Sequence, residues 1–121
     1  MAWSLLLDSA ILDEVGEEVA TAAISTAGSL WATFDVSIEA GGIAVPVLIT
    51  PQLLVDVDTY ASIIENDRVG PISIKNHVPP WNRVVFTIDT DGLEEARLLI
   101  ALSRLGAGES VTVTVRGNSN G

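Results

Sequence analysis

Residues 82–116, NRVVFTIDTDGLEEARLLIALSRLGAGESVTVTVR, are the stretch that decides the predicted fold. In residues 84–89 every second position is Val, Phe or Ile, and the other positions include Thr and Asp. This period-two alternation predicts a strand with one buried side. Residues 111–116 alternate in the same way, with three valines on one side, and predict a second strand.

Between these two strands the sequence predicts a helix. Asp91 is followed three residues later by Glu94, which is the pattern of a helix N-cap, and Gly106 follows an apolar run as a helix stop. The predicted helix covers residues 93–105 and is apolar around most of its circumference. A helix of this kind is buried on more than one side, so residues 1–50 or another subunit must cover it.

A weaker copy of this pattern precedes it in the chain. Residues 53–59, LLVDVDT, are an apolar run that ends in Asp-x-Asp, as residues 85–91, VFTIDTD, do. A short helical segment is predicted at residues 60–66, and a strand follows at residues 72–75. Two β-α-β units in tandem predict a ferredoxin-like arrangement.

The first 50 residues are predicted to be rich in β-hairpins. Residues 30–39 alternate cleanly, Ala40-Gly41-Gly42 reads as a turn, and residues 43–49 read as the returning strand. Residues 9–19 fit either a helix or a hairpin that turns near Gly16, with a strand at residues 19–25. We favour the hairpin because Thr and Ile prefer strands.

We therefore predict an α+β fold in two layers, with a β-rich N-terminal half packed on a ferredoxin-like β-α-β-β-α-β half. The alternative is a β-sandwich with one helix. A length of 121 residues predicts a single domain. Its predicted parts are a hairpin-rich segment (1–50), the β-α-β repeat (51–116) and a polar tail (117–121).

Charge limits the classes of partner. Residues 1–67 contain eleven acidic residues and no Lys or Arg, whereas residues 68–121 contain five acidic and six basic residues, which gives a net charge of −10. So negative a chain is a poor ligand for nucleic acid or anionic lipid. The first basic residue is Arg68, so we expect no secretory signal, and no apolar run approaches a membrane span.

Few residues suit catalysis or cofactor binding. The chain has no cysteine, and its one histidine, His77, lies in a proline-rich segment, where an exposed loop residue is the simpler interpretation. Four aspartates in the two Asp-x-Asp turns, Asp56, Asp58, Asp89 and Asp91, are weak candidates for a Ca²⁺ or Mg²⁺ site. The simpler interpretation is that they cap helices or end strands, so we predict no cofactor and no metal.

The predicted interface residues are apolar. Trp31 falls on the polar side of its strand, Trp81 follows two prolines, and Leu98 and Leu102 lie on the predicted helix. A tryptophan beside acidic residues is a suitable interface anchor, although a second layer covering that face is an equally good explanation.

These observations favour a non-enzymatic structural protein that forms homo-oligomers or docks on a larger protein assembly, in the cytoplasm or in a virion. Phage capsid decoration and tail-connection subunits resemble it in size and composition, with no shared motif. The alternatives are an acidic inhibitor that mimics nucleic acid, and an enzyme or divalent-metal site at the aspartate cluster.

Overall fold

A computed structural model describes residues 3–14, 17–40, 47–63, 72–74, 82–102 and 110–120. These residues form β-strands and contain no helix. The strands, in chain order, are β1 (Ser4–Leu12), β2 (Glu18–Ala20), β3 (Ile24–Ser25), β4 (Trp31–Ala40), β5 (Val47–Asp56), β6 (Thr59–Ser62), β7 (Ile72–Ile74), β8 (Arg83–Asp89), β9 (Glu95–Leu102) and β10 (Val111–Asn120).

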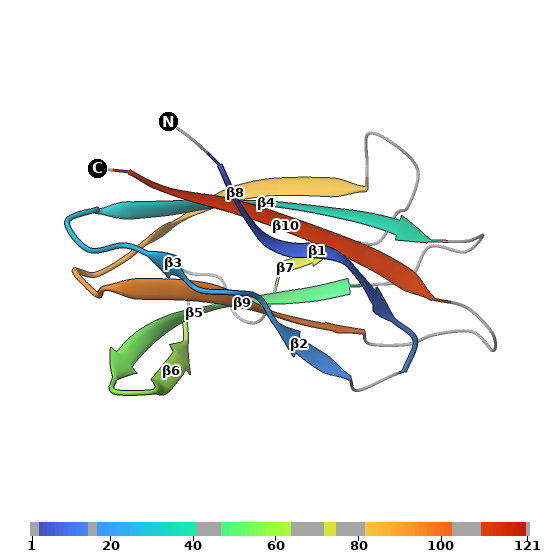
Figure 1. Cartoon of the computed structure of the whole chain (residues 1–121), viewed down its shortest axis with the longest axis horizontal. Coiled ribbons are helices and arrows are strands. Elements are labelled where there is room, and N and C mark those ends of the chain that lie inside the picture. The colour runs from blue at the N-terminus through green and yellow to red at the C-terminus, as the bar shows by residue number, and fades with distance from the viewer. Residues whose placement is uncertain are drawn as a thin grey trace.

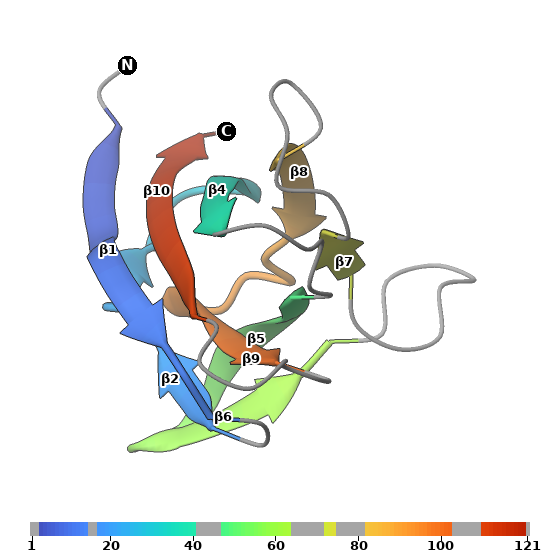
Figure 2. The ribbon, with the colours of Figure 1, turned by 90° about the vertical axis from the view of Figure 1, so that its right-hand side faces the viewer.

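The strands form two antiparallel sheets that face each other (Figures 1 and 2). One sheet has four strands in the order β1-β10-β4-β8. The other has six strands, in which β2 and β3 pair successive parts of β9, and β6 and β7 pair different parts of β5. The second sheet is therefore only four strand positions wide, because β2 with β3 and β6 with β7 each occupy one position.

The order of the strands is that of a jelly roll. We count β2–β3 as one strand and β6–β7 as one strand. β1 then pairs with β10, β2–β3 with β9, β4 with β8, and β5 with β6–β7, so each strand pairs with the one at the mirror position in the chain. The β10–β4 and β9–β5 ladders then join these pairs into the two sheets. A jelly roll is a double-sheet fold in which two Greek keys share one core.

The core lies between the sheets. On β9 the burial alternates residue by residue, and Ala96, Leu98, Ile100 and Leu102 point inward. Phe34 of β4 is fully buried, and its ring centroid lies 5.7 Å from that of Phe86 on β8. Gly117 is closely packed against the core, because a Cβ atom there would lie 2.8 Å from Leu6 Cδ1 and 3.3 Å from Phe34 Cδ1, so a larger residue would displace the Leu6 side chain.

The segment between β2 and β3 forms hydrogen bonds with both sheets. The Thr21 N–H donates to Leu98 O (2.9 Å), and the Thr21 hydroxyl accepts from Leu98 N–H (3.0 Å). The next residue, Ala22, donates its N–H to Leu6 O of β1 in the opposite sheet (3.0 Å). The Thr21 hydroxyl thus takes the place of a backbone carbonyl where the chain leaves the β9 ladder, which satisfies a buried donor.

The predicted helix at residues 93–105 is wrong. Residues 95–102 form β9, a strand between β5 on one side and β2–β3 on the other. The sequence EARLLIAL favours a helix by propensity, but a strand inside a sheet is also apolar on both sides. Pairing on both edges outweighed the local preference, as tertiary context often does.

The predicted α+β class and its ferredoxin-like half are wrong for the same reason. Residues 60–62 of the second expected helix lie in strand β6 (Thr59–Ser62), and the described residues form two antiparallel sheets. The alternative sandwich comes nearer because it has two facing sheets, but its helix is also missing from the described residues.

The expected local hairpins are also wrong in their pairing. β4 pairs β10 and β8, whereas β5 lies in the other sheet. Likewise β1 pairs β10, whereas β2 and β3 pair β9, so the expected N-terminal hairpin has no ladder between its arms, and the strand expected at residues 19–25 is split into β2 and β3. Residues 41–46, with the expected Gly-Gly turn, lie outside the described residues.

Both sheets combine strands from residues 1–50 and from residues 51–116. The polar tail predicted from residue 117 onward contributes residues 117–120 to β10, where Gly117 pairs with Ser4 of β1 and with Phe34 of β4. No helix in the described part of the chain has the length and apolar character needed to cross a membrane.

Candidate functional site

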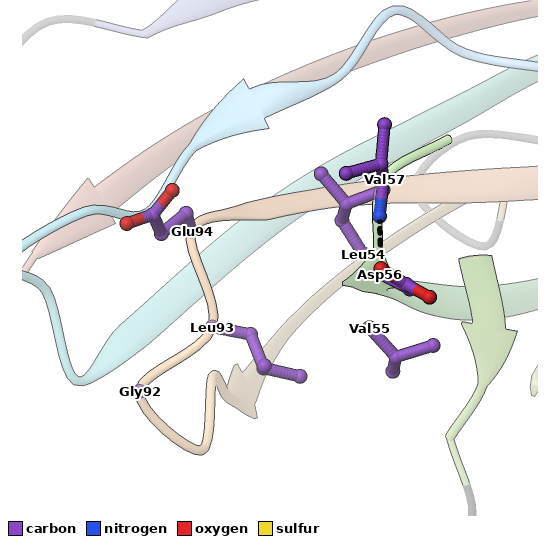
Figure 3. Close-up of a pocket in the computed structure, with 7 residues that line it drawn as sticks. All are labelled: Leu54, Val55, Asp56, Val57, Gly92, Leu93 and Glu94. Atoms are coloured by element: carbon purple, nitrogen blue, oxygen red, sulfur yellow. Dashed lines mark hydrogen bonds between the residues drawn. The ribbon is translucent and has the colours of Figure 1, made fainter. Parts of the chain in front are cut away.

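The two Asp-x-Asp turns lie at the same end of the sandwich and border one groove (Figure 3). One wall comes from the end of β5 and the other from the turn between β8 and β9. The groove has a volume of about 400 Å³. It is lined by Leu54, Val55, Asp56, Val57, Gly92, Leu93 and Glu94.

The aspartates of these turns shape the backbone. Asp56 Oδ1 accepts a hydrogen bond from Val57 N–H (2.7 Å), and Asp58 has a φ of 60°. Asp89 Oδ1 accepts from Asp91 N–H (2.8 Å) in the other turn. Asp and Asn suit such positions because their side chains bond to nearby backbone donors and tolerate positive φ.

Asp91 does not cap a helix, contrary to the sequence prediction. Asp91 and Gly92 have φ angles of 51° and 74°, and Leu93 N–H donates to Thr90 O (2.9 Å) across them. Positive φ at both central residues, with this hydrogen bond, is the pattern of a type I′ turn. The turn carries the chain from β8 in one sheet to β9 in the other.

Among the described residues, no group of three or more Asp, Glu, His or Cys side chains is arranged to hold a metal ion. Asp56 and Asp89 each bond to the backbone of their own turn. Asp58 and Asp91 occupy the strained turn positions themselves. His77 lies outside the described residues.

The four predicted interface residues are not brought together. Trp31 begins β4 and is 44% exposed, on the outer side of its sheet. Leu98 and Leu102 point into the core and are almost fully buried, because β9 and not a helix contains them. Trp81 lies outside the described residues.

Trp31 belongs to a set of exposed apolar side chains that the sequence alone does not predict to lie on one face. The outer side of the β1-β10-β4-β8 sheet presents five large apolar residues that are 44–64% exposed. Strand register and alternation place Leu5, Ile11, Trp31 and Val85 on this side, and Trp3, which directly precedes β1, continues the alternation from Leu5. We call this set the apolar outer face: Trp3, Leu5, Ile11, Trp31 and Val85.

One row of this face crosses all four strands. Leu5 pairs with Arg116, Arg116 with Asp35, and Asp35 with Val85. Asp35 accepts from Arg83 Nε (2.6 Å) and also pairs with the Arg83 Nη2 group. These bonds to Asp35 raise the pKa of the Arg83 guanidinium above its ordinary value, so Arg83 stays charged at all ordinary pH.

The next row contains short polar groups. Thr33 and Thr87 share a hydrogen bond between their hydroxyls (2.9 Å), and Asn118 pairs with Thr33 in register. Asn118 is only 9% exposed, and its buried Oδ1 has no hydrogen-bond donor among the described residues.

The outer side of the other sheet carries a connected network of polar side chains on β5, β6 and β9. Tyr60 donates its hydroxyl to Glu95 Oε2 (2.8 Å), and the Arg97 guanidinium lies 3.9 Å from the centre of the Tyr60 ring. Arg97 Nε donates to Gln52 Oε1 (2.9 Å), and Gln52 donates in turn to Ser62 (3.5 Å). We call this set the polar outer face: Gln52, Tyr60, Ser62, Glu95 and Arg97.

Burial, and then the bond to Glu95, raise the pKa of Tyr60 above its ordinary value. Tyr60 therefore stays protonated at neutral pH and serves as a hydrogen-bond donor within the network.

The chain matches no known protein-family model, and no curated protein matches its sequence.

Proposed function

We propose that this chain is a non-enzymatic protein that self-associates or docks on a larger protein assembly through the apolar outer face. One observation supports the proposal above all. The exposed side chains Leu5, Trp31 and Val85 share one side of one sheet, on β1, β4 and β8. Several exposed tryptophan and aliphatic side chains on one side of a sheet are typical of an interaction site.

The residue types agree with this proposal. Tryptophan is enriched among the residues that dominate interface energies, because it buries a large area with few rotatable bonds. Threonines and one charged pair separate the apolar side chains on this face, in keeping with the mixed polarity of ordinary interfaces.

The test is the mass in solution, measured by light scattering over a range of concentrations. We expect a mass above that of the 12.7 kDa chain, and a lower mass for Trp31→Ser. Val57→Ser is the matched control, because Val57 is 83% exposed but lies in the turn between β5 and β6. A chain that remains monomeric and binds no protein through this face would contradict the proposal.

A second candidate is the acidic nucleic-acid mimic, favoured by the acidic residues of the two turns that border the groove. Asp56 and Glu94 line this groove, and Asp58, Asp89 and Asp91 belong to the same turns. A mimic should remain monomeric and compete with nucleic acid for a basic partner. Loss of that competition in Asp56→Asn with Glu94→Gln, at unchanged mass, distinguishes the mimic from the assembly protein.

A further inference from the structure

Strand β8 forms an edge of its sheet. It has seven residues and pairs with β4 without any shift in register, and in the described part of the chain no strand pairs with its other edge. The opposite edge strand, β1, is interrupted by two register shifts and by Ser9 at a φ of 48°. Bulges of this kind blunt an edge against pairing, whereas a flat edge strand is a template for another strand.

The hydrogen bonds to β4 show which backbone groups of β8 are free. Ile38 N–H donates to Asn82 O (2.9 Å), and Thr90 N–H donates to Leu30 O (3.1 Å). In an antiparallel ladder alternate residues bond to opposite edges. The even-numbered residues of β8 therefore bond to β4, and the N–H and C=O groups of Arg83, Val85, Thr87 and Asp89 point to the free edge.

Building on the proposed function, we propose that β8 pairs with β8 of a second copy of this chain, antiparallel and related by a two-fold axis at Phe86. In this register Val85 exchanges both backbone hydrogen bonds with the partner's Thr87, and Arg83 does so with the partner's Asp89. No other antiparallel register of two β8 strands pairs all four outward-pointing residues. The interface is isologous, so each contact occurs twice.

The side chains fit this register on both sides of the sheet. On the outer side, Arg83, whose side chain is 57% exposed, faces the partner's Asp89, and opposite charges across antiparallel strands are favourable. Val85, 53% exposed, faces the partner's Thr87. On the inner side, Val84 and Phe86 are half-buried in one copy and would be covered by the partner's Ile88 and Phe86.

Pairing of this kind would join two four-stranded sheets into one continuous sheet. The apolar outer faces of the two copies would then lie side by side on the same surface. The partner is a second copy of the chain because the β8 sequence, RVVFTID, matches itself when two copies run in opposite directions. Arg83 at one end then faces Asp89 at the other, and each outward-pointing N–H faces a C=O.

Val85→Pro tests the proposal directly. Proline at position 85 removes an N–H that β4 does not use, and proline is tolerated on an edge strand where the N–H faces solvent. We expect the unmodified chain to have twice the 12.7 kDa mass, Val85→Pro to halve it with unchanged circular dichroism, and Val85→Thr, which keeps the N–H, to remain dimeric.

Disulfide trapping provides a second measurement that does not depend on how well the proline variant folds. The chain has no cysteine, so Phe86→Cys introduces a single thiol. In the proposed register the two Phe86 Cα atoms form a non-hydrogen-bonded pair about 4.5 Å apart, within the range that a disulfide spans. We expect Phe86→Cys to form a covalent dimer on mild oxidation, and Thr87→Cys, which is two residues out of register with itself, to form none.

The possible failures are distinguishable. If the chain assembles but Val85→Pro assembles equally and Phe86→Cys does not cross-link, the β8 pairing is overturned and the proposed function stands. If the unmodified chain is monomeric at millimolar concentration, the β8 pairing is overturned, and self-association through the apolar outer face is overturned with it.

Discussion

On the polar outer face, Tyr60, Arg97 and Gln52 satisfy one another and their neighbours through hydrogen bonds and ring contact. On the apolar outer face, Trp3, Trp31 and Val85 have no such partners in the described part of the chain and leave large apolar areas in water. Both faces arise from the same strand alternation. Long polar side chains can bond to one another within one chain, whereas exposed Trp, Leu and Val lose contact with water only when another apolar surface covers them.

Leu98→Ala should have the largest effect, because Leu98 is fully buried and Leu99, its neighbour on β9, lies half-buried on the outer side. We expect Leu98→Ala to lower the free energy of unfolding by about 2–5 kcal/mol. Leu99→Ala should lower it by about 1 kcal/mol or less. Denaturant unfolding measures both. Equal losses at the two positions would mean that β9 does not separate the core from an outer face.

Arg97→Ala should have a smaller effect, limited to the polar outer face. The variant loses the contact with the Tyr60 ring and the hydrogen bond to Gln52, and we expect a loss of stability of about 1 kcal/mol. Arg116→Ala is the control, because Arg116 is exposed on the apolar outer face and forms no ion pair with any described residue. Its effect should stay within about 0.5 kcal/mol, and a loss equal to that of Arg97→Ala would contradict the contrast between the faces.

The titration of Tyr60 should show the smallest effect. Tyr60 is the only tyrosine, so tyrosinate absorbance reports it alone. Glu95→Gln should lower the pKa of Tyr60 and Arg97→Ala should raise it, because Glu95 stabilises the protonated form and Arg97 opposes it. The pKa of Tyr60 in the folded chain is above the unfolded value of about 10. The protonated Tyr60 hydroxyl therefore contributes its full stabilisation below pH 10, and this stabilisation is lost as the pH rises through the folded pKa. Equal pKa values in all three proteins would contradict the network.

The sequence predicted individual strands better than it predicted their neighbours. The alternation in residues 30–39, 84–88 and 111–115 matches β4, β8 and β10, because a half-buried strand shows its period locally. Pairing is not local: β1 pairs with β10 across nearly the whole chain. The apolar outer face could not be predicted, because it depends on which strands are neighbours.

The residues just before the wrongly predicted helix at 93–105 contain a signal for a tight turn. Asp91-Gly92 is a dipeptide that favours positive φ at both positions, although Asp91 followed by Glu94 also fits a helix cap. A strand after a tight turn would have been the competing interpretation of the same residues. Trp31 was placed on the outer side by alternation, and the structure finds it 44% exposed. Assembly in a virion rests on size and composition alone and stays a prediction.

The position of β10 restricts the order in which the two sheets can form. Every strand of the β2-β9-β5-β6 sheet, with β3 and β7, precedes residue 103, so this sheet can pair before residues 111–120 are present. The other sheet cannot, because β10 lies between β1 and β4 and is the only strand that pairs with β1 among the described residues. Without residues 111–120, β1 has no partner strand among the described residues, and β4 pairs only with β8. The β1-β10-β4-β8 sheet therefore depends on contacts between residues far apart in the sequence, and such contacts slow folding.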